Sequence, residues 1–333
     1  MEKRDTKSSE RKADHIRLAL ESQLRTSDSR FYYEPLLSAH PSGDLEPVDF
    51  SGQTLKAPIW ISSMTGGTEM AGEINRSLAK AAGKYGLGMG LGSCRMLLDD
   101  DTYLKDFQLR KYIGDQHPLY ANLGIAQVQT IINQGRIQSI VDLIDKTETN
   151  GLIVHVNPFQ EWLQPEGDLI LESPIDTLTS LLNKIDIKVI VKEVGQGMGP
   201  DSLRALISLP IAAIDFAAFG GTNFSRMEMA RETNAHPSYD ELVYIGHDVS
   251  EMIGFYNNLL ADSSNSCPMA ILSGGIKSFL DGYYGIQKVN GPAIYGQASP
   301  FLKKALEGQE ELEQHIEKEI AGYQLAEKFL RVK

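Results

Sequence analysis

The sequence of 333 residues is poor in cysteine, in long apolar runs and in positive charge. Its two cysteines, Cys94 and Cys267, lie far apart and form no metal-binding or redox spacing. No apolar run approaches the roughly eighteen residues of a membrane span, and the polar first residues lack a signal-peptide core. The net charge is −12 and the isoelectric point is near 5.1, so nucleic acid and anionic membranes are disfavoured as partners. The cytoplasm is the expected location.

Short apolar runs recur instead, at regular intervals from Pro58 onward, with helical segments between most of them. The runs are continuous rather than alternating, which is typical of parallel strands that are covered on both faces. Eight such strands separated by helices predict an α/β fold, the (β/α)8 or TIM barrel. The expected strands lie within residues 58–64, 86–92, 118–124, 151–157, 187–195, 209–221, 268–275 and 291–297.

Three regions follow from this pattern. Residues 1–56 combine an N-terminal helix with an irregular extension or lid. Residues 57–310 form the barrel, with a helical insertion at 223–266 between strands six and seven, because that piece is too long for an ordinary loop. Residues 311–333 form a C-terminal helix.

The N-terminal helix spans about residues 9–24, with an apolar face of alanine, isoleucine and leucine at helical spacing. Arg11, Lys12 and His15 lie within one turn on a neighbouring face. Their donor groups can converge on a single anion, or they can form a solvated basic face. The sequence leaves both interpretations open.

The densest group of reactive side chains follows the fourth strand. His155 and Asn157 are two residues apart at its end, so their side chains point to the same face. Pro158 ends the strand, and a loop or short turn follows with two amides and three carboxylates: Gln160, Glu161, Gln164, Glu166 and Asp168. Imidazole and amides suit an anionic ligand, and a carboxylate such as Glu161 suits Mg²⁺. The alternative is a loop capped by its own side chains.

Glycine-rich turns follow strands seven and eight. Ser273–Ile276 and Gly296–Ser299 are each expected to open a helix, whose N-terminal N–H groups and dipole attract an anion. Loops in these two positions commonly hold a phosphate in such barrels, so a phosphorylated cofactor such as FMN is the expected ligand.

Lys192 ends the apolar run of strand five. Its charge either pairs with Glu193 or Glu161, or points into the barrel mouth. In a flavin site, a cation there would lie against the N1/O2 edge and stabilise an anionic reduced flavin.

These residues fall in motifs that run through nearly the whole chain, and the set resembles type 2 isopentenyl-diphosphate isomerase, an FMN-dependent family. The motifs are RKADHI (11–16), ISSMTGG (61–67), GLGSCR (90–95), NLGIAQ (122–127), HVNPFQEWLQPEGD (155–168), VKEVGQGM (191–198), DFAAFGGT (215–222) and SGGIKSFLD (273–281). Two residues depart from the family pattern: Cys94 stands where Gln is usual, and Lys277 where Arg is usual.

The resemblance implies the interconversion of isopentenyl diphosphate and dimethylallyl diphosphate by a 1,3-allylic proton shift. It implies reduced FMN as acid/base, Mg²⁺ on the diphosphate, NADPH as the reductant of the flavin, and a homo-oligomer, either a tetramer or an octamer. An FMN-dependent 2-hydroxy-acid oxidase or dehydrogenase and a non-enzymatic phosphate-binding barrel are the alternatives.

The resemblance also assigns residues. The catalytic residues would be Gln160, His155 and Lys192, and Glu161 would bind the metal. The substrate would contact Arg11, Lys12, His15, Ser93, Cys94, Arg95, His155, Asn157 and Gln160. FMN would contact Met64, Thr65, Gly66, Ser93, Asn122, Lys192, Thr222, Gly274, Gly275, Ile276, Lys277, Ala298 and Ser299.

Cys94 carries a further expectation from its neighbours. It stands between two assigned ligand contacts, Ser93 and Arg95, so the sequence predicts a thiol at the barrel rim. The adjacent guanidinium is expected to lower the thiol pKa and make Cys94 the more readily alkylated cysteine.

Overall fold

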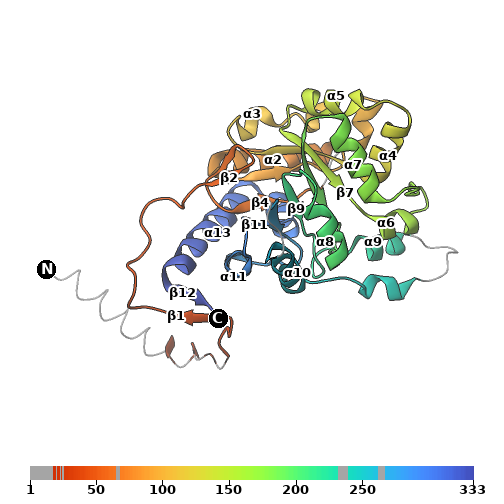
Figure 1. The fold of residues 1–333 in the computed structure, drawn as a ribbon. Helices are drawn as coiled ribbons and strands as arrows, with labels where there is room; N and C mark the ends of the chain where they lie inside the picture. The colour runs from red at the N-terminus through yellow and green to blue at the C-terminus, as the bar shows by residue number, and fades with distance from the viewer. Residues whose placement is uncertain are drawn as a thin grey trace.

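In the described part of the chain, eight parallel strands close into a barrel (Figure 1), and this confirms the predicted (β/α)8 fold. The computed structural model describes residues 18–19, 21–22, 24, 26–64, 68–231, 239–261 and 267–333. The strands follow one another round the barrel in chain order: β4 (Ile59–Ile61), β5 (Gly88–Gly90), β6 (Leu119–Gly124), β7 (Gly151–His155), β8 (Lys188–Lys192), β9 (Ala213–Asp215), β10 (Met269–Leu272) and β11 (Ala293–Gln297).

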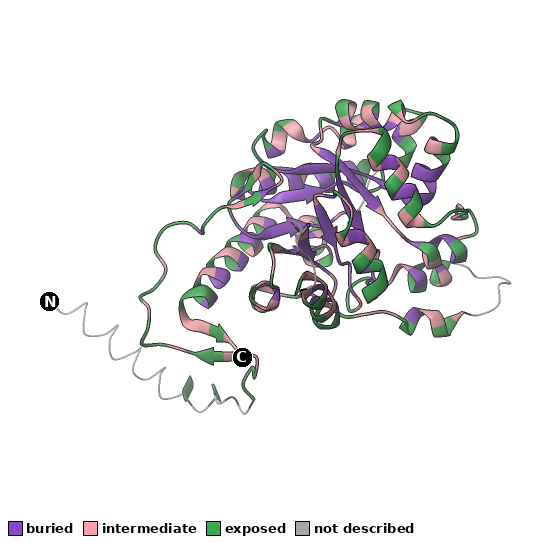
Figure 2. Cartoon of the chain, viewed as in Figure 1, coloured by how far each residue is buried: buried purple, intermediate pink, exposed green. Residues whose placement is uncertain are grey.

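Helices surround these strands and leave them buried (Figure 2). The helices that follow β4 to β8 begin with α2 (Glu69–Tyr85), whose first turn is capped by Thr68 and whose end is marked by Gly86 in the left-handed conformation. The others in this half are η1 (Arg95–Leu98), η2 (Leu104–Asp106), α3 (Arg110–Ile113), α4 (Ile125–Asn133), α5 (Gln138–Thr147), α6 (Pro158–Leu163), α7 (Pro174–Lys184) and α8 (Pro200–Ile207).

The segment between β9 and β10 contains the predicted helical excursion. It comprises α9 (Phe224–Arg231), η3 (Asp240–Tyr244) and α10 (Val249–Ala261) among the described residues. Helix α10 packs between α8 and α11 (Phe279–Lys288), where the barrel requires a helix between its sixth and seventh strands. The excursion proper is therefore α9 with η3, and α9 packs against α6 at the barrel mouth.

The last helices are α12 (Ser299–Glu307) and α13 (Gln309–Phe329), the latter being the expected C-terminal helix. After α13, β12 (Leu330–Val332) pairs antiparallel with β1 (Phe31–Tyr33), so two segments from opposite ends of the chain lie side by side (Figure 1). None of the described helices is long and apolar enough to cross a membrane.

Two apolar layers hold the fold together. The larger layer lies between strands and helices. The smaller one fills the barrel interior, with Trp60, Tyr120 and Ile190 among its members. The hairpin of β2 (Val48–Phe50) and β3 (Gln53–Leu55) adds Phe50 and Leu55 to this inner layer, and Phe50 stacks on Trp60 with ring centroids 5.1 Å apart. The hairpin therefore closes one end of the barrel and leaves the carboxyl ends of the strands open.

Candidate active site

A ring of polar and small residues lies directly above the inner apolar layer. Side chains alternate along a strand, so the residue two positions beyond each inner apolar residue also faces the interior. Beyond Ile153 and Ile190 these positions are His155 and Lys192. Around the barrel the ring reads Ser62, Gly90, Asn122, His155, Lys192, Asp215, Ser273 and Gly296. The site thus begins where apolar side chains give way to groups that form hydrogen bonds.

His155 is held in one orientation by Asn122. The Asn122 amide donates to the carbonyl of Leu91 (3.0 Å), so its oxygen faces His155 Nδ1 at 2.7 Å. An amide oxygen only accepts, so Nδ1 carries the hydrogen and Nε2 is left without one. Burial, with the nearby Lys192 charge, lowers the pKa of His155 to about 3. His155 is therefore a neutral imidazole in this structure.

The stretch after His155 is a six-residue helix, α6, rather than the predicted loop, because Pro158 suits the first helical position. It places Gln160 and Glu161 against Asn157. The Asn157 amide donates to Gln160 Oε1 (3.1 Å) and to Glu161 Oε1 (3.0 Å), and Glu161 Oε2 accepts the Asp168 N–H (2.8 Å). The predicted group therefore forms one connected cluster, in which the Glu161 carboxylate is buried.

A carboxylate that the sequence reading did not single out completes this cluster. Gln160 Nε2 donates to Glu228 Oε1 on α9 (3.0 Å), and Glu228 is buried. Its other oxygen pairs with Arg231 (2.7 Å), which also contacts Glu166 (3.2 Å). The Glu228–Arg231 spacing is that of a helical ion pair, but only the packing of α9 on α6 brings it to Gln160.

Arg95 turns toward the same cluster. Its guanidinium pairs with Asp168 Oδ2 at 2.7 Å, and Gln127 Nε2 donates to the same oxygen at 2.8 Å. Ser93 is exposed beside it, with its hydroxyl 3.5 Å from the Arg95 N–H. The two assigned rim residues thus lie beside the loop that carries Asp168 and follows α6.

Lys192 is the member of the ring that β8 contributes. Its ammonium donates to the backbone carbonyl of Glu193 (2.7 Å), whereas the Glu193 carboxylate accepts N–H groups of residues 195–197, so the ion-pair interpretation of Lys192 is wrong. In the strand register, Lys192 stands between His155 and Asp215. Burial raises the pKa of Asp215, whose Oδ2 has no hydrogen-bond partner among the described residues.

A cavity of about 540 Å³ opens beside Lys192, and backbone rather than side chains forms much of its wall. Gly274 and Gly275 have φ of +87° and +74°, and a Cβ at Gly274 would lie 2.0 Å from the Ala218 carbonyl oxygen. Gly220 approaches Gly275 so closely that a Cβ would be 3.3 Å from its Cα. Only glycine allows this approach, which brings N–H groups to the cavity surface.

The polar groups of the cavity have the capacity to bind a phosphorylated ligand. The hydroxyls of Ser62 and Ser63, both in its lining, are buried without a partner among the described residues. The hydroxyls of Thr222 and Ser299 lie 3.3 Å apart. Helix α12 begins at Ser299, as predicted, and has no side-chain cap, so the N–H groups of Ser299 and Phe301 are available to an anion, whereas Pro300 has none. Met64, Ile276, Lys277 and Ala298 also line the cavity.

The prediction that Ser273–Ile276 opens a helix is wrong. Helix α11 begins at Phe279, after a capping box in which Ser278 and Asp281 bond reciprocally. Asp281 also accepts the N–H of Lys277 (2.9 Å), so the N–H groups just before α11 are already bonded within the protein. The glycine turn, not the α11 terminus, therefore faces the cavity.

The prediction for Cys94 is also wrong. Its side chain is fully buried in the core and its sulfur donates to the carbonyl of Gly92 (3.4 Å). Burial raises the pKa of the thiol to about 12 instead of lowering it. Arg95 cannot oppose this effect, because its guanidinium turns away to Asp168. The thiol therefore does not face the rim.

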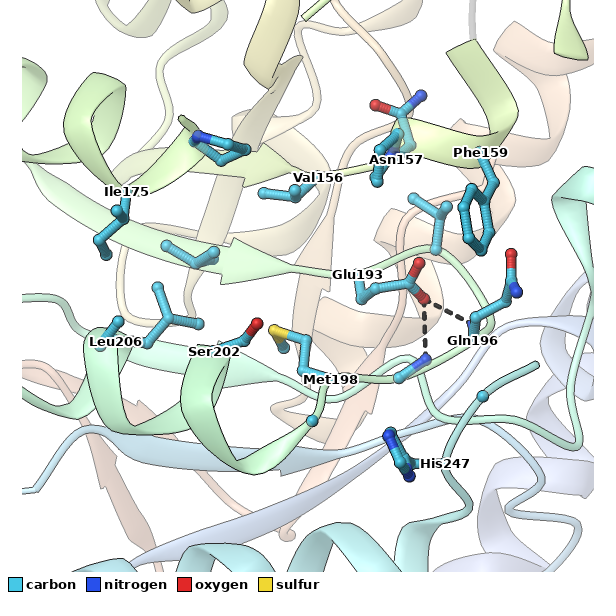
Figure 3. Close-up of a pocket in the computed structure, with 18 of the residues that line it drawn as sticks. Val156, Asn157, Phe159, Ile175, Glu193, Gln196, Met198, Ser202, Leu206 and His247 are labelled. Atoms are coloured by element: carbon cyan, nitrogen blue, oxygen red, sulfur yellow. Dashed lines mark hydrogen bonds between the residues drawn. The ribbon is translucent and has the colours of Figure 1, made fainter. Parts of the chain in front are cut away.

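A second cavity, of about 580 Å³, lies on the other side of β8 (Figure 3). Glu193 comes directly after β8, and its carboxylate points into this cavity toward the backbone at Gln196. The lining is mainly apolar, with Ile175, Leu206 and Met198 from α7, α8 and the loop before α8. Its central carboxylate, Glu193, is satisfied by backbone N–H groups, and two members of the predicted cluster, Asn157 and Gln160, also line this cavity.

Several assigned residues lie outside the described part of the chain. These are Arg11, Lys12, His15, Thr65 and Gly66. Their assignments stay predictions.

Comparison with known proteins shows first the fold and then the family of the chain. The architecture matches FMN-associated barrels at the level of the fold alone: a mandelate oxidase variant with a monooxide FMN adduct (12% identity, TM-score 0.55, 91% of this chain and 88% of that one) and a flavocytochrome b2 variant with sulfite bound (12%, 0.63, 89% and 71%). No family model matches the chain.

Curated relatives then give the family. The isopentenyl-diphosphate delta-isomerase of Rickettsia felis is 36% identical over 302 residues, 89% of this chain and 85% of the relative. That of Nostoc sp. is 35% identical over 320 residues, 93% and 88%. The chain belongs to the isopentenyl-diphosphate delta-isomerase family, which confirms the resemblance seen in its motifs.

Proposed function

We propose that this protein interconverts isopentenyl diphosphate and dimethylallyl diphosphate by a 1,3-allylic proton shift. The observation that carries the proposal is the arrangement of two groups at the rim. A glycine-walled cavity adjoins Lys192, and the neighbouring strand, β7, ends in His155 and leads into the cluster around Glu161. The names of the curated relatives support the same reaction.

FMN is the proposed cofactor of the glycine-walled cavity. The glycine turn at 274–275, the first turn of α12 and the hydroxyls of Thr222 and Ser299 would hold its phosphate, and Lys192 would face its ring. Reduced FMN supplies a proton donor and an electron-rich ring beside the alkene. Lys192 contributes a buried positive charge that favours the anionic reduced form. NADPH is the proposed reductant.

Mg²⁺ is proposed to bind with the substrate rather than as a resident metal. Among the described residues, no group of three or more His, Cys, Asp or Glu side chains is arranged to hold a metal. One carboxylate, Glu161, suits an ion that takes its other ligands from diphosphate and water, and beside it lies the Oδ1 of Asn157, which no described residue bonds. Arg95 and the N-terminal Arg11 and Lys12 would neutralise the remaining charge.

Gln160 is proposed to face the substrate carbon and Glu228 to hold the proton. An amide does not itself gain or lose protons at neutral pH. Gln160 is, however, fixed between the Asn157 amide and the Glu228 carboxylate, so Glu228 is within one hydrogen bond of the amide that is proposed to face the substrate. The diphosphate offers acceptor oxygens, so His155 would orient it by taking up a proton at Nε2 and donating from there, which the negative charge of the substrate favours.

The oxidase alternative is not favoured by the described residues. It requires a histidine base beside an arginine that grips a carboxylate. His247 instead stacks edge-on to Phe255, with ring centroids 5.2 Å apart, and faces the second cavity (Figure 3). Arg231 is committed to Glu228 and Glu166.

The test is product analysis. Purified protein with FMN, NADPH and Mg²⁺ is incubated with isopentenyl diphosphate under anaerobic conditions, and dimethylallyl diphosphate is measured by chromatography. We expect turnover that depends on flavin reduction, visible as loss of the oxidised flavin absorbance. Absence of dimethylallyl diphosphate with fully reduced flavin would contradict the proposal. The cytoplasmic location and the homo-oligomer, tetramer or octamer, are also proposals, and the latter is measurable by light scattering.

A further inference from the structure

Asp168 stands where two parts of the proposed substrate site meet. Its carboxylate accepts from Arg95 (2.7 Å) and from the buried amide of Gln127 (2.8 Å). Its backbone N–H donates to Glu161 Oε2 (2.8 Å). One residue therefore contacts both the proposed diphosphate-binding guanidinium and the proposed metal ligand.

The contact with Arg95 has the geometry that a phosphate oxygen would have. A guanidinium binds carboxylate and phosphate oxygens through the same N–H donors at the same distances. The donor of Arg95 that meets Asp168 cannot at the same time meet a substrate oxygen along that direction. A diphosphate that binds Arg95 there must therefore displace the carboxylate.

The surroundings of the pair keep the free energy of this exchange small. Arg95 and Asp168 are 55% and 39% exposed, so water screens their attraction and the pair is worth little. When Arg95 is withdrawn, Asp168 Oδ2 keeps the Gln127 amide as a partner. The carboxylate is thus released without losing every hydrogen bond.

We propose that Asp168 is an internal competitor of the substrate, a positioning residue that takes the place of the diphosphate on Arg95 until the substrate enters. Its backbone bond to Glu161 links the exchange to the metal ligand, so movement of Asp168 frees an oxygen of Glu161 for Mg²⁺. The inference rests on the proposed function, because it needs a diphosphate at Arg95.

Inorganic pyrophosphate is the probe, and its Kd is measured by calorimetry on the flavin-loaded, full-length protein with and without Mg²⁺. We expect Asp168→Asn to tighten pyrophosphate binding roughly two- to fivefold, which is the range for loss of an exposed ion pair. Asp168→Ser serves as a second variant if the first does not fold, as judged by thermal unfolding.

Glu166→Gln is the matched control. It removes the same charge from the same loop, two residues away, but its partner is Arg231 rather than Arg95. We expect its Kd to stay within about 1.5-fold of wild type in moderate salt, because distant exposed charges are screened. In a protein that already carries Arg95→Gln, adding Asp168→Asn should not tighten pyrophosphate binding.

Unchanged or weaker binding by Asp168→Asn, an equal gain from Glu166→Gln, or a gain that survives in the Arg95→Gln background would overturn the inference. Lack of pyrophosphate binding by the wild type would do so too. Turnover of isopentenyl diphosphate is measured separately. If the wild type turns over isopentenyl diphosphate but Asp168→Asn does not change the Kd for pyrophosphate, only this inference is contradicted. If the expected changes in Kd are found but the wild type has no turnover, only the proposed function is contradicted.

Discussion

The two halves of the barrel rim bind ligands in different ways. On β6 to β8 the site consists of side chains that already hold one another, from Asn122 and His155 to Gln160 and Glu228. On β10, β11 and β4 it consists of glycine backbone and of hydroxyls, such as that of Ser62, that have no hydrogen-bond partner in the described part of the chain. The first half is ordered before any ligand arrives, and the second is complementary to a ligand that supplies the missing partners.

This difference predicts different sensitivities to mutation. A preformed side-chain network can lose one hydrogen bond and keep its shape, with a cost of about 1 kcal/mol for a typical bond. A wall made of close backbone contacts cannot accept one extra carbon without moving. The glycine half should therefore be disrupted by the smallest substitution, and the side-chain half should show graded effects.

The largest expected effect is that of Gly274→Ala. The new Cβ would lie 2.0 Å from the Ala218 carbonyl oxygen at a φ of +87°, so the turn must shift. We expect FMN affinity to fall by about a hundredfold or more, which corresponds to the few kcal/mol that such strain costs. The measurement is flavin fluorescence titration.

Gly254→Ala is its control. This glycine lies in α10 with no atom within 4 Å of the position of a Cβ, so FMN affinity should not change. Equal FMN affinity in both variants and wild type would show that the glycine turn does not form the cofactor site.

Lys192→Met should have the next largest effect. Methionine keeps the apolar stem and removes the buried charge, so the anionic reduced flavin loses its stabilisation. We expect a more negative flavin midpoint potential and turnover roughly a hundredfold slower. Potentiometry with reference dyes measures the first and product formation the second. If both match wild type, Lys192 has only a structural role.

Glu161→Gln tests the side-chain half. The amide can still accept the Asp168 N–H, but it is a poorer ligand for a hard dication than a carboxylate. We expect the Mg²⁺ concentration for half-maximal turnover to rise roughly tenfold, with little change at saturation. An Mg²⁺ titration that matches the Glu166→Gln control would remove Glu161 from the metal site.

The smallest effect concerns Glu319, which lies behind the glycine half. It is buried on α13, where Tyr295 (3.3 Å) and Gln297 (3.4 Å) donate to it. Burial raises its pKa to about 7 from an ordinary 4.5; the two donors and Lys318 oppose this rise, and Asp281 adds slightly to it.

The folded protein therefore holds this proton more tightly than the unfolded chain does. The resulting stability is complete below about pH 4.5 and is lost as the pH rises to about 7. Glu319→Gln should be insensitive to this change, so its melting temperature should exceed that of wild type by about 2–4 °C at pH 8 and equal it near pH 4.5. The same difference at both pH values would show that Glu319 does not titrate in this range.

Much of the fold and part of the site could be predicted from the sequence. The continuous apolar runs predicted the barrel, and strand alternation predicted that His155 and Lys192 face its interior. The start of α11 was also readable, because Ser278 and Asp281 have the spacing of a capping box. The glycines before it, by contrast, predict an earlier start that the structure does not have.

The rest depends on contacts between distant segments. Gln160 and Glu228 are 68 residues apart in sequence and meet because α9 folds over α6. Cys94 stands between two exposed residues and yet is buried, since a turn outside regular structure has no fixed alternation. Arg95 was expected to act on its neighbour but is drawn to Asp168, which no local pattern reveals.

The pairing of β1 with β12 has a consequence for the order in which the chain can fold. Phe31 pairs with Val332, and Arg30 forms an ion pair with Asp281, 251 residues away, at 2.8 Å. Closing a flexible loop of that size costs on the order of 5 kcal/mol in chain entropy, unless intervening structure has already brought its ends together. During synthesis, β1 cannot pair with β12 until β12 has left the ribosome. The barrel must therefore assemble first, and the segment that follows the Arg11–Lys12 motif is tied down among the final steps.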